Sequence, residues 1–199
     1  MKEFSEHRLT KDMSFETSST AILVVDMLND FCEPAGAMPL PGSERLYPRI
    51  QSLLEAARQV GSPVIWICDE HPPGDKEFEK RTEHCLVGSW GAQVVDALKP
   101  PEIEYRVAKR RYSGFFETDL DLRLRELDIK HLIITGVVTN ICVRSTAHDA
   151  FFRGYDVIIP EDCVAATGER EQASSLYDID THYGVVSNLH SVLEQLVRT

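Results

Sequence analysis

The sequence is short of basic residues and contains no long apolar run. Its 199 residues include 21 Lys and Arg against 32 Asp and Glu, which gives a formal net charge of -11. Nucleic acids and anionic membranes attract basic surfaces, so this charge argues against both as partners. No apolar run approaches the roughly 18 residues that a membrane span requires. The charge leaves small-molecule chemistry open, because a single pocket can reverse the local field.

Paired cysteines are also lacking. The sequence has five cysteines, an odd number, and they are widely separated with no Cys-x-x-Cys pair. They are Cys32, Cys68, Cys85, Cys142 and Cys163. This pattern disfavours the disulfide framework of a small secreted protein and favours a reducing compartment, so we expect a cytoplasmic protein.

The first residues are polar and mixed in charge, with no apolar signal core. We interpret residues 1–19 as a polar arm, which could contact a neighbouring subunit. Residues 20–199 are expected to form a single domain.

Within that domain, short β-branched runs alternate with helical patterns. The runs cover residues 21–25, 64–67, 103–107, 131–135 and 157–159. Each is almost continuously apolar, which is typical of strands that are covered on both faces. The alternation predicts an α/β fold: a three-layer, doubly wound, mostly parallel sheet of the Rossmann-like kind.

The segments between the runs show helical spacing of apolar residues. They cover residues 46–57, 118–127, 142–153 and 189–196. We expect Ser43 to cap the first helix and Gly61 to end it, and Pro48 either to make its first turn irregular or to delay its start. Gly154 is expected to end the third helix. Residues 69–90 do not fit the alternation and predict a long functional loop.

Three reactive side chains are predicted at the carboxyl ends of strands, where open parallel sheets bind their ligands. Asp26 ends the first run, Lys109 follows the third, and Cys142 follows the fourth at the expected start of a helix. A helix N-terminus and a nearby lysine both favour a thiolate. A carboxylate can accept the thiol proton and later return it to a leaving amine. Together these groups indicate thiol-based acyl transfer.

Each of these residues also has an ordinary interpretation when it is taken alone. A strand-end aspartate is often a turn residue, a buried cysteine is usually inert core, and a lysine is usually a solvated surface residue. The joint placement of the three residues is what favours the catalytic interpretation.

Several longer stretches carry a resemblance to a known family. Residues 24–31 (VVDMLNDF), 108–115 (AKRRYSGF) and 135–146 (TGVVTNICVRST) resemble the isochorismatase-like cysteine hydrolases. Residues 154–162 extend the third block. This superfamily includes nicotinamidases, N-carbamoylsarcosine amidohydrolases and ureidoacrylate-type amidases. The similarity spans about residues 20–186 and implies the isochorismatase-like hydrolase fold, in a homodimer or homotetramer.

The resemblance implies a role for each matching residue. Cys142 matches the family nucleophile, Asp26 the general acid/base, and Lys109 the third member of the triad. Val137 and Val138 match the position of a non-proline cis peptide in the family. There the N–H group of Val138, together with that of Cys142, faces the oxyanion. The implied reaction cleaves a C–N bond of a small amide, ureide or carbamoyl compound through a thioester, and needs no cofactor.

Other functions stay open beside this one. Nicotinamidase activity with a bound metal is one alternative. A non-catalytic binding module on the same fold is another, although the complete triad argues against it. A vinyl-ether hydrolase of the isochorismatase kind is a third. Such enzymes lack a cysteine at the position of Cys142, so its presence disfavours that activity.

The predicted loop contains a candidate metal site. Asp69, His71 and His84 resemble the metal-binding triplet of nicotinamidases. One carboxylate and two imidazoles would suit zinc, iron or manganese. Nicotinamidases commonly have a further histidine between these residues, where this chain has Lys76 or Glu77. The other interpretation is that these residues only shape the loop.

The predicted substrate pocket departs from the nicotinamidase pattern. Arg81 stands where nicotinamidases have a tryptophan that packs on the substrate ring, and Leu28 stands where they often have glutamine. Arg81 is suited to pair with a substrate carboxylate, or else is an exposed surface residue. Phe31, Trp90 and Tyr112 are candidate aromatic walls, with core packing as the alternative.

Overall fold

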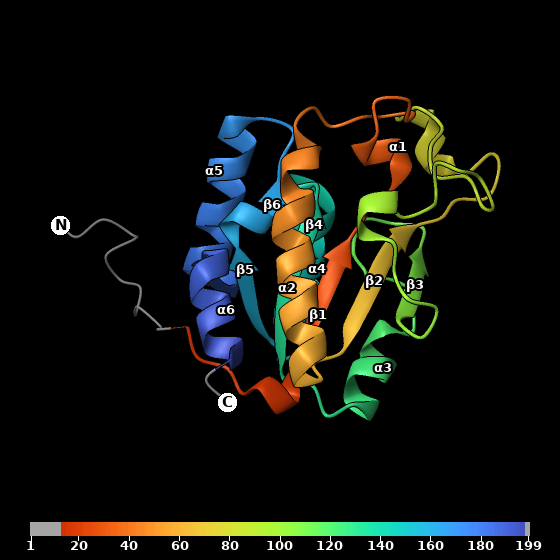
Figure 1. The fold of residues 1–199 in the computed structure, drawn as a ribbon. Coiled ribbons are helices and arrows are strands. Elements are labelled where there is room, and N and C mark those ends of the chain that lie inside the picture. The colour runs from red at the N-terminus through yellow and green to blue at the C-terminus, as the bar shows by residue number, and fades with distance from the viewer. Residues whose placement is uncertain (1–12, 198–199) are drawn as a thin grey trace.

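The protein forms one parallel sheet with helices on both faces (Figure 1). The computed structural model describes residues 13–197. Seven strands form the sheet in the order β3-β2-β1-β4-β5-β7, with β6 paired to β4, and every pairing between them is parallel. The strands are β1 (Thr20–Val25), β2 (Val64–Asp69), β3 (Tyr105–Lys109), β4 (His131–Val137), β5 (Asp156–Pro160), β6 (Val164–Ala165) and β7 (Gly184–Ser187). The predicted fold class is therefore confirmed.

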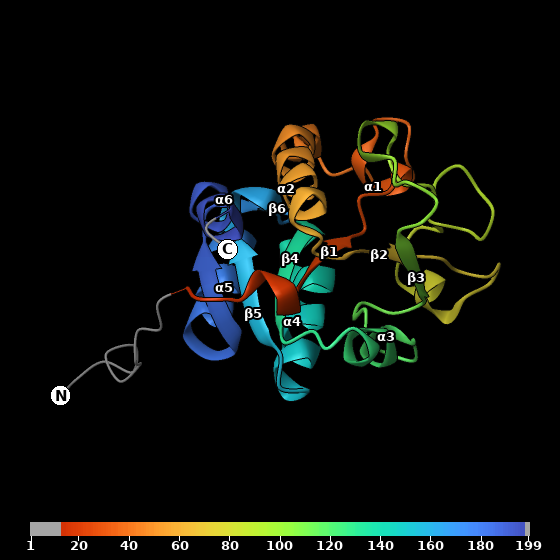
Figure 2. The ribbon, with the colours of Figure 1, turned by 60° about the horizontal axis from the view of Figure 1, so that its bottom comes forward.

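Strand β1 shows why the fold has three layers. All six of its residues are buried. Because side chains alternate along a strand, Ile22 and Val24 join the hydrophobic core on one face, while Leu23 and Val25 join the core on the other. Helices α2 and α6 cover the first face, and α3 and α4 cover the second (Figure 2). The helices are α1 (Asn29–Cys32), α2 (Tyr47–Val60), α3 (Leu120–Glu126), α4 (Arg144–Phe152), α5 (Glu169–Asp178) and α6 (Leu189–Val197).

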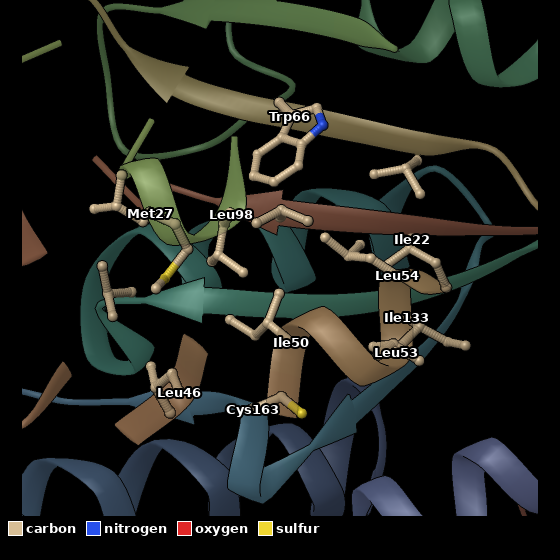
Figure 3. Close-up of a cluster of buried hydrophobic side chains, with 14 of the residues drawn as sticks. Ile22, Met27, Leu46, Ile50, Leu53, Leu54, Trp66, Leu98, Ile133 and Cys163 are labelled. Carbon is tan, nitrogen blue, oxygen red and sulfur yellow. The ribbon is translucent and has the colours of Figure 1, made fainter. Parts of the chain in front are cut away.

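Helix α2 fills the first core with its apolar face. Ile50, Leu53 and Leu54 are at most 1 % exposed and lie against the sheet, in a cluster that also contains Trp66 (Figure 3). Pro48 lies in the first turn, and the regular helix begins at Tyr47 after a 3-10 turn, as predicted. Gly61 ends the helix in the left-handed conformation, with φ of 76°.

Several element boundaries differ from the predictions. Ser43 does not cap α2, because its hydroxyl donates to the carbonyl of Cys32 at 3.3 Å and the 3-10 turn lies between Ser43 and the helix. The third strand begins at Tyr105, since Ile103 is 93 % exposed in the preceding turn. Strands β6 and β7 and helix α5 were not predicted. β6 is only two residues long, and one residue of α5, Ser175, is buried.

The described end of the predicted arm lies on its own domain. Phe15 is 6 % exposed and belongs to the core under α2. The side-chain amide of Gln195 in α6 donates to the carbonyl of Phe15 at 3.2 Å. Residues 1–12 of the predicted arm lie outside the described residues. Among residues 13–197, no helix has the length and apolar character needed to cross a bilayer.

Candidate active site

Adjacent strand ends bring the charged residues together. Asp26 directly follows β1, Asp69 ends β2, and Lys109 ends β3, where it is paired in register with Asp69. Because β3, β2 and β1 are neighbours in the sheet, all three residues lie at one edge. Asp26 has φ of 51°, and its N–H donates to the carbonyl of Ile67 in β2 at 2.8 Å. The chain therefore turns immediately after β1, at the carboxylate.

Lys109 is the centre of the cluster. Its Nζ lies 2.8 Å from Asp26 Oδ2, donates to Asp69 Oδ1, and lies 3.7 Å from Cys142 Sγ. The backbone N–H of Asp69 donates to the other carboxylate oxygen of Asp26 at 2.8 Å. Lys109 is completely buried, as Asp26 and Asp69 nearly are. One ammonium group thus joins two buried carboxylates and a thiol.

Burial and neighbouring charges shift the pKa values of the cluster. Burial, together with the charge of Asp69, raises the pKa of Asp26 to about 6 in spite of Lys109. Burial also opposes ionisation of Asp69, but Lys109 together with His71 and His84 outweighs it and holds the pKa of that carboxyl well below its usual range. Burial would lower the pKa of Lys109, but the two carboxylates raise it well above the usual value. At neutral pH the two aspartates and Lys109 are therefore ionised.

Cys142 does not behave as its position in the sequence suggested. It lies in a π-helical turn, Thr139–Val143, that directly precedes α4. Burial raises the pKa of its thiol well above the usual value, and the attraction of Lys109 only partly offsets this. Lys109 thus favours the thiolate, as predicted, but burial outweighs it in the resting site. The thiol keeps its proton, and Asp26 is the base positioned to accept it.

The end of β4 has the backbone geometry that the resemblance implied. The peptide bond between Val137 and Val138 is cis, and both residues line the cavity above Cys142. Gly136 precedes it with φ of 101°, and a Cβ atom there would lie 1.9 Å from the carbonyl oxygen of Val25. Only glycine allows β4 to approach β1 so closely at this point.

A cavity of about 250 Å³ opens above the thiol. Its floor contains Cys142, Asp26 and Asp69, and Phe31, Arg81 and Tyr112 are in its walls, as predicted. Its other lining residues are Met38, Pro39, Leu40, Glu77, His84, Val137, Val138, Ile141 and Thr167. The segment 38–40 was not predicted, because it has no periodicity and no reactive side chain.

Trp90 does not line the cavity, contrary to the prediction. Its side chain is 49 % exposed. Its backbone joins the loop to α1, since its carbonyl accepts a hydrogen bond from the side-chain amide of Asn29 at 2.9 Å.

Asp69, His71 and His84 lie together, as predicted for a metal site. His71 Nε2 is 3.8 Å and His84 Nε2 is 3.7 Å from Asp69 Oδ2, and all three residues are buried. Among the described residues, neither ring nitrogen of His71 has a hydrogen-bond partner. His84 Nδ1 lies 2.7 Å from the carbonyl of Thr82, so Nδ1 carries the hydrogen and Nε2 offers its lone pair. One carboxylate and two imidazoles converging on one point fit a divalent transition metal.

Comparison with known proteins identifies the family. Residues 20–191 match the family model described as the isochorismatase domain. The chain belongs to the isochorismatase family. The resemblance stated from the sequence is thereby confirmed.

Solved structures of isochorismatase-family hydrolases resemble this chain along nearly its full length. An isochorismatase-like hydrolase from Alkaliphilus metalliredigens is 38 % identical, with a TM-score of 0.85, and the match covers 88 % of this chain and 98 % of that one. An N-carbamoylsarcosine amidase from Thermoplasma acidophilum is 33 % identical, with a TM-score of 0.79 and coverage of 86 % and 96 %. A pyrazinamidase from Pyrococcus horikoshii, solved in complex with zinc, is 29 % identical, with a TM-score of 0.81 and coverage of 85 % and 99 %. This isochorismatase-family chain therefore has amide hydrolases among its relatives.

Proposed function

We propose that this protein hydrolyses a C–N bond of a small amide, ureide or carbamoyl compound through a thioester on Cys142. The observation that carries the proposal is the position of Lys109, whose Nζ contacts Asp26 and Asp69 and lies 3.7 Å from the sulfur at the floor of a cavity. All five cysteines are free and buried, which supports a cytoplasmic site of action. Assembly into dimers or tetramers stays a prediction.

The reaction follows from the order of the groups. Asp26 accepts the thiol proton, and the Cys142 sulfur attacks the substrate carbonyl carbon, whose π electrons move onto the oxygen. The tetrahedral intermediate collapses, the C–N bond breaks, and Asp26 returns the proton to the leaving amine. Water then attacks the thioester while Asp26 accepts a proton from it. The acid leaves, and the thiol is restored with that proton.

Two further groups belong to this proposal. The N–H groups of Val138 and Cys142 stabilise the oxyanion, supported by the cis peptide at the cavity wall. Asp69, His71 and His84 would hold zinc, iron or manganese, which when bound supplies a Lewis acid that holds water or a substrate heteroatom at the floor. The triad chemistry itself requires no cofactor.

The proposal is tested by a substrate panel combined with detection of the acyl-enzyme. Ammonia release is measured for nicotinamide, N-carbamoyl amino acids and ureidoacrylate-like compounds, with and without zinc or manganese. Reactions quenched in acid are examined by intact mass spectrometry. We expect turnover of at least one amide or ureide and an acyl adduct on the peptide that contains Cys142. An adduct on another residue, or turnover without any cysteine adduct, contradicts the thioester route.

The same panel separates the alternatives. Turnover restricted to nicotinamide and dependent on metal would identify a nicotinamidase proper. Turnover of isochorismate instead of amides would identify a vinyl-ether hydrolase. Binding of a panel compound with no turnover and no adduct would favour a non-catalytic binding module.

Arg81 is expected to select substrates that carry a carboxylate. Among the residues lining the cavity it is the only arginine or lysine, and no hydrogen bond or ion pair of its side chain is found within the described residues. A hydrogen bond between charged groups contributes about 1.5–3 kcal/mol. Replacing Arg81 with methionine should therefore raise KM for carboxylate-bearing amides roughly 10- to 100-fold, and leave KM for neutral amides almost unchanged.

The matched control is Lys80→Met, which removes one positive charge from the same loop at an exposed residue that does not line the cavity. Its KM values should equal those of the wild type. Equal increases for anionic and neutral amides in Arg81→Met would contradict a carboxylate contact.

A further inference from the structure

A buried carboxylate in the loop after β2 takes no part in the site described so far. The side chain of Asp75 is completely buried, yet it neither lines the cavity nor belongs to the candidate metal ligands. Its Oδ2 lies 3.4 Å from His71 Nδ1, the nitrogen on the far side of the imidazole from Asp69. Asp75 therefore lies beside the His71 nitrogen that faces away from the candidate metal site.

Two arginines hold Asp75 in this position. Arg110 donates to Oδ2 through Nε at 3.1 Å and Nη2 at 2.9 Å, and Arg111 Nη1 donates to Oδ1 at 3.0 Å. Both arginines directly follow Lys109 at the end of β3. A buried carboxylate is costly unless it is paired, and here two cations make it stable beside an imidazole. The end of β3 therefore supports the triad and the back of the metal site together.

The imidazole of His71 is also held from its other sides. The His71 backbone N–H donates to the carbonyl of Cys85 at 2.9 Å, which ties it to the residue after His84. The ring of Phe78 meets the imidazole edge-on, with centroids 5.3 Å apart. With the backbone and the ring face fixed, the charged group nearest Nδ1 decides which nitrogen carries the hydrogen and which offers a lone pair.

We propose that Asp75 is a positioning residue for a divalent metal ion at Asp69, His71 and His84. Its carboxylate, 3.4 Å from His71 Nδ1, favours the tautomer that carries the hydrogen on Nδ1 and so leaves the Nε2 lone pair directed towards Asp69. Carboxylates behind ligating histidines typically contribute 10- to 100-fold to metal affinity. The inference rests on the metal-binding part of the proposed function and does not depend on which substrate is cleaved.

Asp75 has a second, separable role in the loop. Its Oδ1 accepts the backbone N–H of Glu77 at 3.0 Å and so caps the short 3-10 turn Lys76–Glu79. Asparagine caps helical turns about as well as aspartate. Asp75→Asn therefore keeps the cap and the side-chain shape, and removes the charge that faces His71 and the arginines.

The test measures binding of Zn²⁺ and Mn²⁺ by calorimetry on the full chain stripped of metal. We expect Asp75→Asn to weaken Kd roughly 10- to 100-fold and to change the visible spectrum of the Co²⁺-loaded protein. Asp121→Asn is the matched control, because Asp121 also accepts from an arginine and a second donor, at 2.9 Å each, but on α3. Its Kd values should stay within about twofold of the wild type.

Two readouts exclude a merely structural effect. The far-ultraviolet circular dichroism of the metal-free Asp75→Asn protein and the rate at which iodoacetamide alkylates its Cys142 should match those of metal-free wild type. If Asp75→Asn does not fold, the double variant Arg110→Gln, Arg111→Gln loosens the same carboxylate from an exposed side and should weaken Kd in the same direction.

Wild-type affinity in a folded Asp75→Asn protein would overturn the proposal, as would failure of the wild type to bind either metal. If Asp75→Asn does not fold, wild-type metal affinity in the double variant Arg110→Gln, Arg111→Gln would overturn the proposal instead. A failure of the proposed amidase activity can be distinguished from a failure of this proposal, because metal affinity is measured without substrate.

Discussion

Replacement of Cys142 by alanine should abolish C–N bond hydrolysis while the fold persists. The sulfur is the atom that the proposed reaction places on the substrate carbonyl carbon, and neither Asp26 nor Lys109 takes over that role in the proposal. Loss of a catalytic nucleophile typically lowers kcat by about 10⁴-fold or more. The measurement is ammonia release from the best panel substrate, with circular dichroism and thermal melting to verify the fold. The acyl adduct seen by mass spectrometry should disappear together with turnover.

The control for this variant is Cys163→Ala. Cys163 is completely buried in the core under α2, so its replacement removes the same sulfur atom from the interior but lies outside the cavity. We expect Cys163→Ala to retain wild-type kcat, with at most a modest loss of stability. Turnover by Cys142→Ala within tenfold of the wild type would rule out this sulfur as the nucleophile.

Replacement of Lys109 by methionine should destabilise the protein by about 3–5 kcal/mol, because it leaves buried carboxylates without their cation. Methionine is unbranched and nearly as long as lysine but supplies no charge. The hydrogen bond from the backbone N–H of Asp69 to the Asp26 carboxylate remains, but neither carboxylate then has a cation. Turnover should also be lost, since Lys109 no longer polarises the thiol and the acid/base. Urea unfolding followed by circular dichroism measures the free energy of unfolding.

Two further variants make this test specific. Lys99→Met changes an exposed lysine and should alter the free energy of unfolding by no more than about 0.5 kcal/mol. Adding Asp26→Asn to Lys109→Met removes the uncompensated charge and should recover part of the lost stability, but no activity. Additive losses in the double variant would show that the ion pair does not account for the destabilisation.

The central strands could be predicted from the sequence because their burial is a local property. The runs that became β1 and β4 are apolar at nearly every position, and both strands were located to within two residues of their observed ends. Strands β6 and β7 escaped prediction because their short segments become strands only by pairing with β4 and β5. Their hydrogen-bond partners lie far away in the sequence, so no local pattern marks them.

The candidate site divides in the same way. Asp26, Lys109 and Cys142 were predicted because each follows or ends a strand run, and parallel strands bring their carboxyl ends to one edge. Trp90 was predicted to line the pocket from its residue type alone, but in the folded protein its side chain is exposed and does not line the cavity. The contact of Lys109 with Asp69, which joins the triad to the candidate metal site, depends on the neighbouring register of β2 and β3.

The sequence by itself determined the α/β class and the family, and it indicated the three residues of the proposed triad, because periodicity and motifs are carried by residues close together in the chain. Only the tertiary structure decided the protonation of the thiol, since burial outweighs the attraction of Lys109 once the sheet and α4 enclose Cys142. It alone also decided the role of Asp75, because that carboxylate acquires His71 and two arginines from segments that meet only on folding. Motifs identify the groups that react, whereas solvation and the neighbours of each group depend on packing between distant segments.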